Sequence, residues 1–301
     1  MRKKKVILIT GGTGLLGKGI EETIQNDFEI ISIHQRPYII QGSKITHFSL
    51  DIRDKQAVDD LFSKYRFDAV IHAAGIASVD YVETNYAESL ESNIVGTLNI
   101  TSACRRSGTY LVYISTNAVF DGENPPYREC DPVAPINKYG RLKVECERLV
   151  TETLEHFCIV RPILMYGWNH RICRPNIATW IYDKLLNGES LTLVNDVYEN
   201  PLFNIQCGRA LWEVVQKRPS GIFHLAGKDI VNRFEFGKQI AATFGLDDSL
   251  LNSVKSSYFP HIAPRPSNTS FISNRMEDEL GVKALSLEEG LLEMKALMVR
   301  K

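Results

Sequence analysis

Residues 5–17 read KVILITGGTGLLG, a stretch that indicates how the chain begins to fold. Lys5–Thr10 is short, apolar and rich in β-branched residues, which is typical of a buried parallel strand. Glycines follow at once, and Leu15–Gln25 then has the pattern of a helix. Glycine permits a sharp turn and a close approach to a pyrophosphate, to which the helix N-terminus offers unpaired N–H groups. The stretch therefore predicts a dinucleotide-binding turn, with these residues against the cofactor: Gly11, Thr13, Gly14, Leu15 and Leu16.

Strands and helices are expected to alternate through the first half of the chain. The expected strands are Glu29–His34, Ile45–Leu50, Ala69–His72, Tyr110–Ser115 and Phe157–Pro162, and the expected helices are Asp54–Tyr65, Glu88–Arg106 and Asn137–Glu155. Such alternation is typical of a parallel sheet with helices on both faces. The predicted fold class is therefore α/β, with a doubly wound parallel sheet.

The second half of the chain has a weaker pattern. After Gly167, Pro, Asn and Gly are scattered among short helical stretches such as Asn176–Leu186 and Phe234–Phe244, without a Gly/Ser-rich linker or an internal repeat. We expect a dinucleotide-binding domain at residues 1–165, to which elements around 200–228 return. Residues 166–199 and 229–301 should form a smaller C-terminal α/β substrate lobe. Function is then expected in the crevice between them, at the carboxyl ends of the strands.

Composition and charge argue against several classes of function. The 301 residues are 44% hydrophobic and 24% charged, ordinary values for a soluble globular protein. With 35 Lys+Arg against 36 Asp+Glu, the chain lacks the basic excess of a nucleic-acid binder. It has no apolar run long enough to span a membrane, and Val6–Ile9 is too short for a signal-peptide core. We expect no nucleic-acid partner and no membrane partner.

Cysteine and histidine patterns suggest neither disulfides nor a dedicated metal site. The cysteines are Cys104, Cys130, Cys146, Cys158, Cys173 and Cys207. No CxxC pair occurs, so we expect buried, reduced thiols in a cytoplasmic protein. The seven histidines include no HExxH motif.

Residues that follow the later strands indicate which dinucleotide binds. An acidic residue after the second strand would favour NAD, but this chain has Arg36 there, and a guanidinium pairs well with a ribose 2′-phosphate. NADP(H) is therefore predicted to be preferred, with NAD(H) as an option, because Arg36 also suits a solvated surface. Asp51 and Ile52 are placed to meet the adenine. Ala73 and Ala74 are small enough to let the cofactor lie flat.

Tyr139 and Lys143 are four residues apart and hence on one helix face. A nearby ammonium lowers the pKa of a phenol, so we expect Tyr139 to act as the proton donor. Lys143 would also hold the nicotinamide ribose. Thr116 follows a strand and is expected to hydrogen-bond the substrate carbonyl oxygen, its alternative role being a local turn hydrogen bond. Asn93 is expected to be structural.

Together these motifs resemble the extended short-chain dehydrogenase/reductase family, and more closely its dTDP-4-dehydrorhamnose reductase branch. The segments that carry the resemblance are 11–17, 51–54, 72–74, 79–80, 115–122, 139–143 and 263–268. The resemblance implies a Rossmann-type sheet with a small substrate lobe, a nicotinamide cofactor and reduction of a keto group on a nucleotide-linked sugar.

The resemblance also implies roles for individual side chains. It places catalysis on Thr116, Tyr139 and Lys143, and it places Asn176 and Arg265 at the substrate cleft. Arg171 and Arg174, in the loop after residue 167, are candidates for contact with the substrate diphosphate, although an exposed loop also carries arginine for solubility.

Three positions near the expected cleft depart from the reductase pattern. Asn117 and Ala118 stand where the branch usually has Asp and Tyr, and Leu164 stands where it often has Trp. Asn117 is a predicted substrate contact. Its amide is neutral, so any role that depends on the negative charge of the Asp is absent. We expect an unchanged cofactor half and an altered sugar specificity.

Three functions remain open from the residues. The leading one is an NADP(H)-dependent reductase of a 4-keto nucleotide sugar in surface polysaccharide synthesis. An epimerase or dehydratase of the same fold is disfavoured because residues 117–118 lack the acidic pair of dehydratases. A regulatory role is the third, because residues 113–129 are very similar to the regulatory β subunit of methionine adenosyltransferase. A homodimer is also left open.

Overall fold

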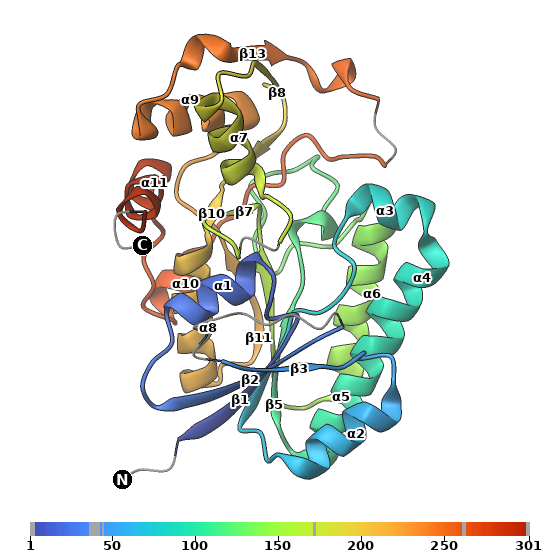
Figure 1. Ribbon diagram of the computed structural model, residues 1–301. Helices are drawn as coiled ribbons and strands as arrows, with labels where there is room; N and C mark the ends of the chain where they lie inside the picture. The colour runs from blue at the N-terminus through green and yellow to red at the C-terminus, as the bar shows by residue number, and fades with distance from the viewer. Residues whose placement is uncertain (1–3, 36–42, 44, 171–172, 261–262, 299–301) are drawn as a thin grey trace.

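The computed structural model describes residues 4–35, 43, 45–170, 173–260 and 263–298. Its centre is a parallel sheet of seven strands in the order β11-β6-β5-β4-β1-β2-β3 (Figure 1). The strands are β1 Lys5–Thr10, β2 Phe28–His34, β3 Thr46–Ser49, β4 Ala69–His72, β5 Tyr110–Ile114, β6 Phe157–Pro162 and β11 Gly221–Leu225. This architecture confirms the predicted Rossmann-type α/β fold.

Helices cover both faces of the sheet and enclose two apolar cores (Figure 1). On one face lie α1 Leu15–Glu22, α8 Asn204–Lys217 and α10 Asn274–Asp278. On the other lie α2 Lys55–Lys64, α5 Gly96–Ser107 and α6 Lys138–Thr153. Burial of these strands on both faces explains why they read as continuous apolar runs.

The predicted helix over Glu88–Arg106 consists of several segments. After α3 Val79–Thr84 come α4 Tyr86–Leu90, a π-helical turn η1 Glu91–Val95, and α5. In the π-helical turn, the Asn93 amide donates to the carbonyl oxygens of Ser89 and Ile76, which is consistent with its expected structural role.

The remaining elements build a third apolar core beyond the carboxyl edge of the sheet (Figure 1). They are β7 Met165–Tyr166, α7 Ile177–Leu186, β8 Leu191–Val194, β9 Tyr198–Glu199, β10 Leu202–Phe203, β12 Val231–Asn232, α9 Arg233–Phe244, β13 Leu251–Val254 and α11 Leu287–Ala296. Three 3₁₀ turns are η2 Asn117–Val119, η3 Asp248–Leu250 and η4 Ser256–Tyr258. Capping boxes at Asn176, Asn232 and Ser286 satisfy the first N–H groups of α7, α9 and α11.

Residues 204–225 return to the sheet from within the second half. β11 pairs with β6, with Gly221 opposite Cys158 and Leu225 opposite Pro162. α8 packs on α1 so closely that a Cβ at Gly19 would clash with the carbonyl oxygen of Asn204. The domain boundaries given above remain a prediction.

All six cysteines are free. Four are buried as expected, but Cys130 is exposed and Cys173 is only partly buried. The prediction of burial was therefore wrong for Cys130, which lies in the loop before α6, and incomplete for Cys173. Within the described ranges, no helix is long and apolar enough to cross a membrane, and no group of three or more potential side-chain ligands is placed to hold a metal ion.

Candidate active site

A cavity of about 750 Å³ opens at the carboxyl ends of the central strands. Its lining on the dinucleotide side includes Gly11, Thr13, Gly14, Leu15, Leu16, Asp51, Ile52, Ala73 and Ala74. Its lining on the other side includes Thr116, Asn117, Ala118, Tyr139, Lys143, Leu164, Glu199, Arg233 and Arg265. The predicted cofactor residues that the structure describes, and the predicted Thr/Tyr/Lys set, therefore share one cavity.

The glycine turn has the backbone geometry that its sequence predicts. Gly11 has φ +75°, and a Cβ there would lie 2.9 Å from the backbone nitrogen of Ala74. That Ala74 N–H donates to the Thr10 hydroxyl at 3.0 Å. The turn and the β4 end are thus held in direct contact, and the first N–H groups of α1 have no partner within the helix.

Asp51 is fixed by Arg53, two residues further along the chain. The Arg53 guanidinium donates to its carboxylate at 2.6 Å, and the Gln35 amide donates to the same group at 3.1 Å. The hydrogen bond from Arg53 holds the pKa of Asp51 below its usual range. Asp51 is therefore an anionic wall of the cavity. Arg36, on which the predicted NADP(H) preference rests, lies outside the described residues.

Tyr139 and Lys143 lie on the buried face of α6, which begins at a well-satisfied cap. The Asn137 side chain accepts from the Gly140 N–H at 2.8 Å and donates to the Pro264 carbonyl oxygen at 3.1 Å. This ties the start of α6 to residues far along the chain. The side chains of Tyr139, Lys143 and Thr116 are all buried.

The expected lowering of the Tyr139 pKa is not seen. Burial raises the pKa of Tyr139 to about 12, outweighing the opposite effect of a hydrogen bond with Thr116. Lys143 instead donates to the Ile114 carbonyl oxygen at 2.6 Å, with its nitrogen 4.4 Å from the centre of the Tyr113 ring. Burial also lowers the pKa of Lys143. In this structure the Lys143 ammonium therefore hydrogen-bonds the β5 backbone, and burial favours the neutral form of the Tyr139 phenol.

Thr116 makes the local turn contact that was its alternative role, and its hydrogen bond to a substrate carbonyl stays a prediction. Its hydroxyl accepts from the Ala118 N–H at 3.1 Å, which is the local turn hydrogen bond, and the same side chain lines the cavity. Asn117 follows and donates to the Glu199 carboxylate at 2.8 Å. Glu199 in turn pairs with Arg233 at 2.5 Å. Neither Glu199 nor Arg233 was identified from the sequence, since no local motif surrounds them.

Only some of the predicted substrate contacts reach the cavity. Arg265 lines it and pairs with Asp80 at 2.7 Å. Asn176 and Arg174 are not among the lining residues. The Asn176 side chain is occupied by the α7 cap and by a 2.7 Å hydrogen bond to the Gly167 carbonyl oxygen, which corrects its predicted role. Arg171 lies outside the described residues.

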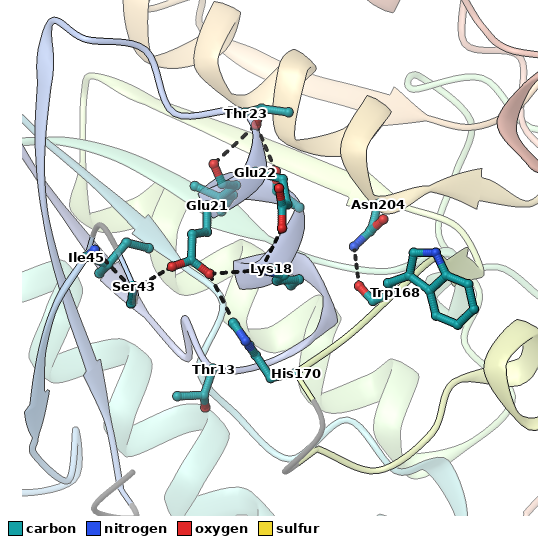
Figure 2. Close-up of polar contacts among 12 residues, drawn as sticks. Thr13, Lys18, Glu21, Glu22, Thr23, Ser43, Ile45, Trp168, His170 and Asn204 are labelled. Atoms are coloured by element: carbon teal, nitrogen blue, oxygen red, sulfur yellow. Dashed lines mark hydrogen bonds and ion pairs between the residues drawn. The ribbon is translucent and has the colours of Figure 1, made fainter. Parts of the chain in front are cut away.

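The described residues of the loop after residue 167 include two that contact α1 and the turn before it (Figure 2). His170 lies 3.6 Å from the Glu21 carboxylate, which also accepts from Ser43 and Lys18. The Cys173 thiol donates to the Thr13 carbonyl oxygen at 2.8 Å. His170 and Cys173 therefore lie against α1 and the dinucleotide turn, and Arg174, the next residue, does not line the cavity.

Comparison with models of known protein families identifies the family of this chain. The model of the RmlD substrate binding domain matches residues 4–299. The chain belongs to this family. A similar solved structure is dTDP-4-dehydrorhamnose reductase from Bacillus anthracis str. Ames in complex with NADP. Its TM-score is 0.85 at 27% identity, covering 98% of this chain and 99% of that one. The predicted resemblance to this reductase branch is confirmed.

Two curated relatives extend the comparison of this RmlD-family chain. Methionine adenosyltransferase 2 subunit beta from Bos taurus is 29% identical over 282 residues, covering 90% of this chain and 81% of the relative. The spore coat polysaccharide biosynthesis protein SpsK from Bacillus subtilis (strain 168) is 27% identical over 289 residues, covering 95% of each chain. The chain is thus similar both to a methionine adenosyltransferase subunit and to a polysaccharide biosynthesis protein.

Proposed function

We propose that this protein is an NADP(H)-dependent reductase of a 4-keto nucleotide sugar. The observation that carries the proposal is the single cavity that joins the glycine turn to Thr116, Tyr139 and Lys143. The similarity to a dTDP-4-dehydrorhamnose reductase in complex with NADP supports the cofactor and the substrate class. The similarity to SpsK supports a place in surface polysaccharide synthesis, which we expect in the cytoplasm.

The residues present fit a nicotinamide dinucleotide. The volume of about 750 Å³ lies within the range of ligand pockets. Gly11 packs on Ala74 too closely for a side chain, so the backbone of the turn borders the cavity, and the N-terminus of α1 suits the pyrophosphate. Asp51 and Ile52 would border the adenosine, and Arg36 would pair with a 2′-phosphate. When bound, the cofactor supplies hydride to a carbonyl carbon.

The protein side chains supply the proton and hold the carbonyl. With a pKa of about 12, Tyr139 is protonated at neutral pH and can donate its proton as the carbonyl becomes an alkoxide. Thr116 would hydrogen-bond the same oxygen. Lys143 would stabilise the resulting phenolate by its charge while it holds the Ile114 carbonyl. A neutral buried phenol suits the reductive direction, because reduction consumes a proton.

The test is NADPH consumption with a panel of 4-keto nucleotide sugars that vary in sugar and nucleotide. We expect one member to be reduced to an alcohol with one NADPH oxidised for each product molecule. Tighter binding of NADH than of NADPH would contradict the cofactor preference. Conversion of a sugar without net NADPH consumption would instead indicate an epimerase or a dehydratase.

A regulatory role is the second candidate, and the 29% identity to methionine adenosyltransferase 2 subunit beta over 90% of the chain favours it. In that case the protein would bind a methionine adenosyltransferase catalytic subunit and change its kinetics. The two candidates separate in one comparison. A regulator changes the KM or kcat of the partner and oxidises no NADPH with the sugar panel. A reductase oxidises NADPH with one of the sugars and leaves the KM and kcat of the partner unchanged.

A further inference from the structure

The substrate side of the cavity contains a charged pair that joins two distant parts of the chain. Glu199 ends β9, and Arg233 begins α9 directly after β12, the strand that pairs with β9. Their side chains lie 2.5 Å apart, with the Glu199 side chain 12% exposed. Glu199 also accepts a 2.8 Å hydrogen bond from Asn117, beside the catalytic candidate Thr116.

The contacts of Asn117 use both ends of its amide. The amide nitrogen donates to Glu199 at 2.8 Å and to the Thr269 hydroxyl at 2.6 Å. The amide oxygen is then turned toward the Thr116 hydroxyl, which donates to it at 3.3 Å. A carboxylate accepts hydrogen bonds only, so Glu199 determines which end of the amide faces it and which end faces Thr116.

We propose that Glu199 is a positioning residue that orients the Thr116 hydroxyl through Asn117 and thereby requires an amide at position 117. The proposal rests on the proposed function, because Thr116 matters to catalysis only in that setting. It also accounts for the departure from the reductase pattern noted above. An Asp at position 117 would place a second acceptor-only group against Glu199, and neither would donate.

The experiment exchanges the two groups. The variants are Asn117→Asp, Glu199→Gln and the double variant, in which the new amide at 199 donates to the new carboxylate at 117. With the sugar that the panel identifies, we expect Asn117→Asp to lower kcat about tenfold or more, the loss of roughly one hydrogen bond in the transition state. The KM for NADPH should stay within about twofold, because the glycine turn is untouched. The double variant should recover most of the lost kcat.

A second measurement does not depend on turnover. In Asn117→Asp, the new carboxyl group at position 117 lies against the carboxyl group of Glu199, so the pKa of one of them should rise. That carboxyl loses its proton as the pH rises, which leaves two negative charges in contact. The Tm of Asn117→Asp relative to the unmodified protein should therefore fall by a few degrees between about pH 5 and about pH 8. Arg233, Arg265, Tyr139 and Lys143 face the same cavity and are not substituted in any variant, although Glu199→Gln removes the carboxylate that pairs with Arg233. The double variant should lose this pH dependence.

A matched control places the same chemistry on the surface. The Gln56 amide donates to Asp60 at 2.8 Å on the exposed face of α2. Gln56→Glu creates a similar pair of carboxylates in water, where screening is strong. We expect its Tm to change little with pH and its kcat to match that of the unmodified protein.

Each outcome bears on one part of the proposal. If Asn117→Asp shows no added pH dependence of Tm, the contact between positions 117 and 199 is refuted. If the double variant recovers Tm but not kcat, Glu199 only supports the structure and the positioning role is refuted. If the unmodified protein reduces no sugar, the proposed function fails by itself. The Thr116 rotamer in crystals of Asn117→Asp and of the double variant then decides the positioning role: displacement in the single variant alone supports it, and an unmoved hydroxyl in both refutes it.

Discussion

The Lys143 ammonium donates a hydrogen bond to the carbonyl oxygen of Ile114, and the two atoms lie 2.6 Å apart in a buried position. The bond joins α6 to the last residue of β5, just before Ser115 and Thr116. Lys143 therefore holds the backbone that presents the Thr116 hydroxyl. This role is separate from any contact with a nicotinamide ribose.

Lys143→Met should weaken both stability and turnover. The substitution leaves the buried Ile114 carbonyl without its donor, which costs about 1–3 kcal/mol in the free energy of unfolding. Urea unfolding would measure this loss, and NADPH consumption would measure the loss of rate. The exposed Lys184, which pairs with Glu189 at the surface, provides the control, and Lys184→Met should change stability by less than about 1 kcal/mol. Unchanged stability in Lys143→Met would contradict the backbone role.

Tyr139→Phe should abolish most of the turnover and keep the fold. Loss of a positioned proton donor lowers kcat by about 10²–10⁴-fold. The affinity for NADPH, followed by fluorescence titration, should change little because the ring remains in place. Tyr258 is 66% exposed, and Tyr258→Phe is the matched control, which should keep the full rate. A Tyr139→Phe variant with unaltered kcat would show that another group donates the proton.

Acid should destabilise the protein partly through His72. This residue is fully buried between the hydroxyls of Thr10 at 2.6 Å and Thr97 at 3.1 Å, and burial, aided by the charge of Lys143, lowers its pKa to about 3. The unfolded chain takes up a proton below about pH 6.5, whereas the folded protein does not until near pH 3. The stabilisation is therefore complete above about pH 6.5 and is lost as the pH falls, by about 2 kcal/mol at pH 5.

His72→Gln tests this dependence, because it removes the titrating group and keeps polar contacts. We expect its free energy of unfolding to fall less between about pH 7 and about pH 5 than that of the unmodified protein, by about 2 kcal/mol. Urea unfolding at each pH measures the slope, which is independent of any uniform loss of stability. His156 is exposed and offers the control substitution. Equal slopes for His72→Gln and the unmodified protein would contradict a neutral buried imidazole.

Gly19→Ala should destabilise the contact between α1 and α8. A Cβ at Gly19 would collide with the Asn204 carbonyl oxygen, a backbone atom that cannot move aside as a side chain can. We expect a loss of about 2 kcal/mol or more in the free energy of unfolding. Gly188→Ala is the comparison: its φ of +71° is strained for alanine, but no atom lies within 4 Å of the new Cβ, so it should cost only about 1 kcal/mol. Equal losses would show that the helices separate easily.

The local patterns of the sequence predicted six of the seven strands of the sheet, and β11 was expected only within the elements around 200–228. Lys5–Thr10, Ala69–His72 and Phe157–Pro162 are strands with the predicted bounds, because both faces of these strands are apolar. The carboxyl ends of β1, β3 and β4 bring the predicted turn, Asp51 and Ala73 to one cavity, as parallel topology requires. The roles of the individual site residues stay predictions.

Contacts between distant residues could not be predicted in the same way. Asn176 was expected at the cleft, but its side chain is shared between the α7 cap and Gly167. Lys143 was expected beside the phenol, but its bond to Ile114 depends on how α6 packs on β5. Asn117 was recognised as a departure, whereas its partner Glu199 is 82 residues away in the sequence. Such partners are determined by tertiary packing, which no short pattern encodes.

The close packing of α8 on α1 has a consequence for how the protein is made. The ribosome completes the glycine turn and the first six strands long before it reaches Asn204 and Leu225. Until then, the face of α1 that packs on α8 and the edge of β6 that pairs with β11 have no partner. The nascent chain therefore exposes an apolar surface and an unpaired strand edge. Protection of these surfaces by chaperones during that interval is therefore expected to raise the yield of folded protein.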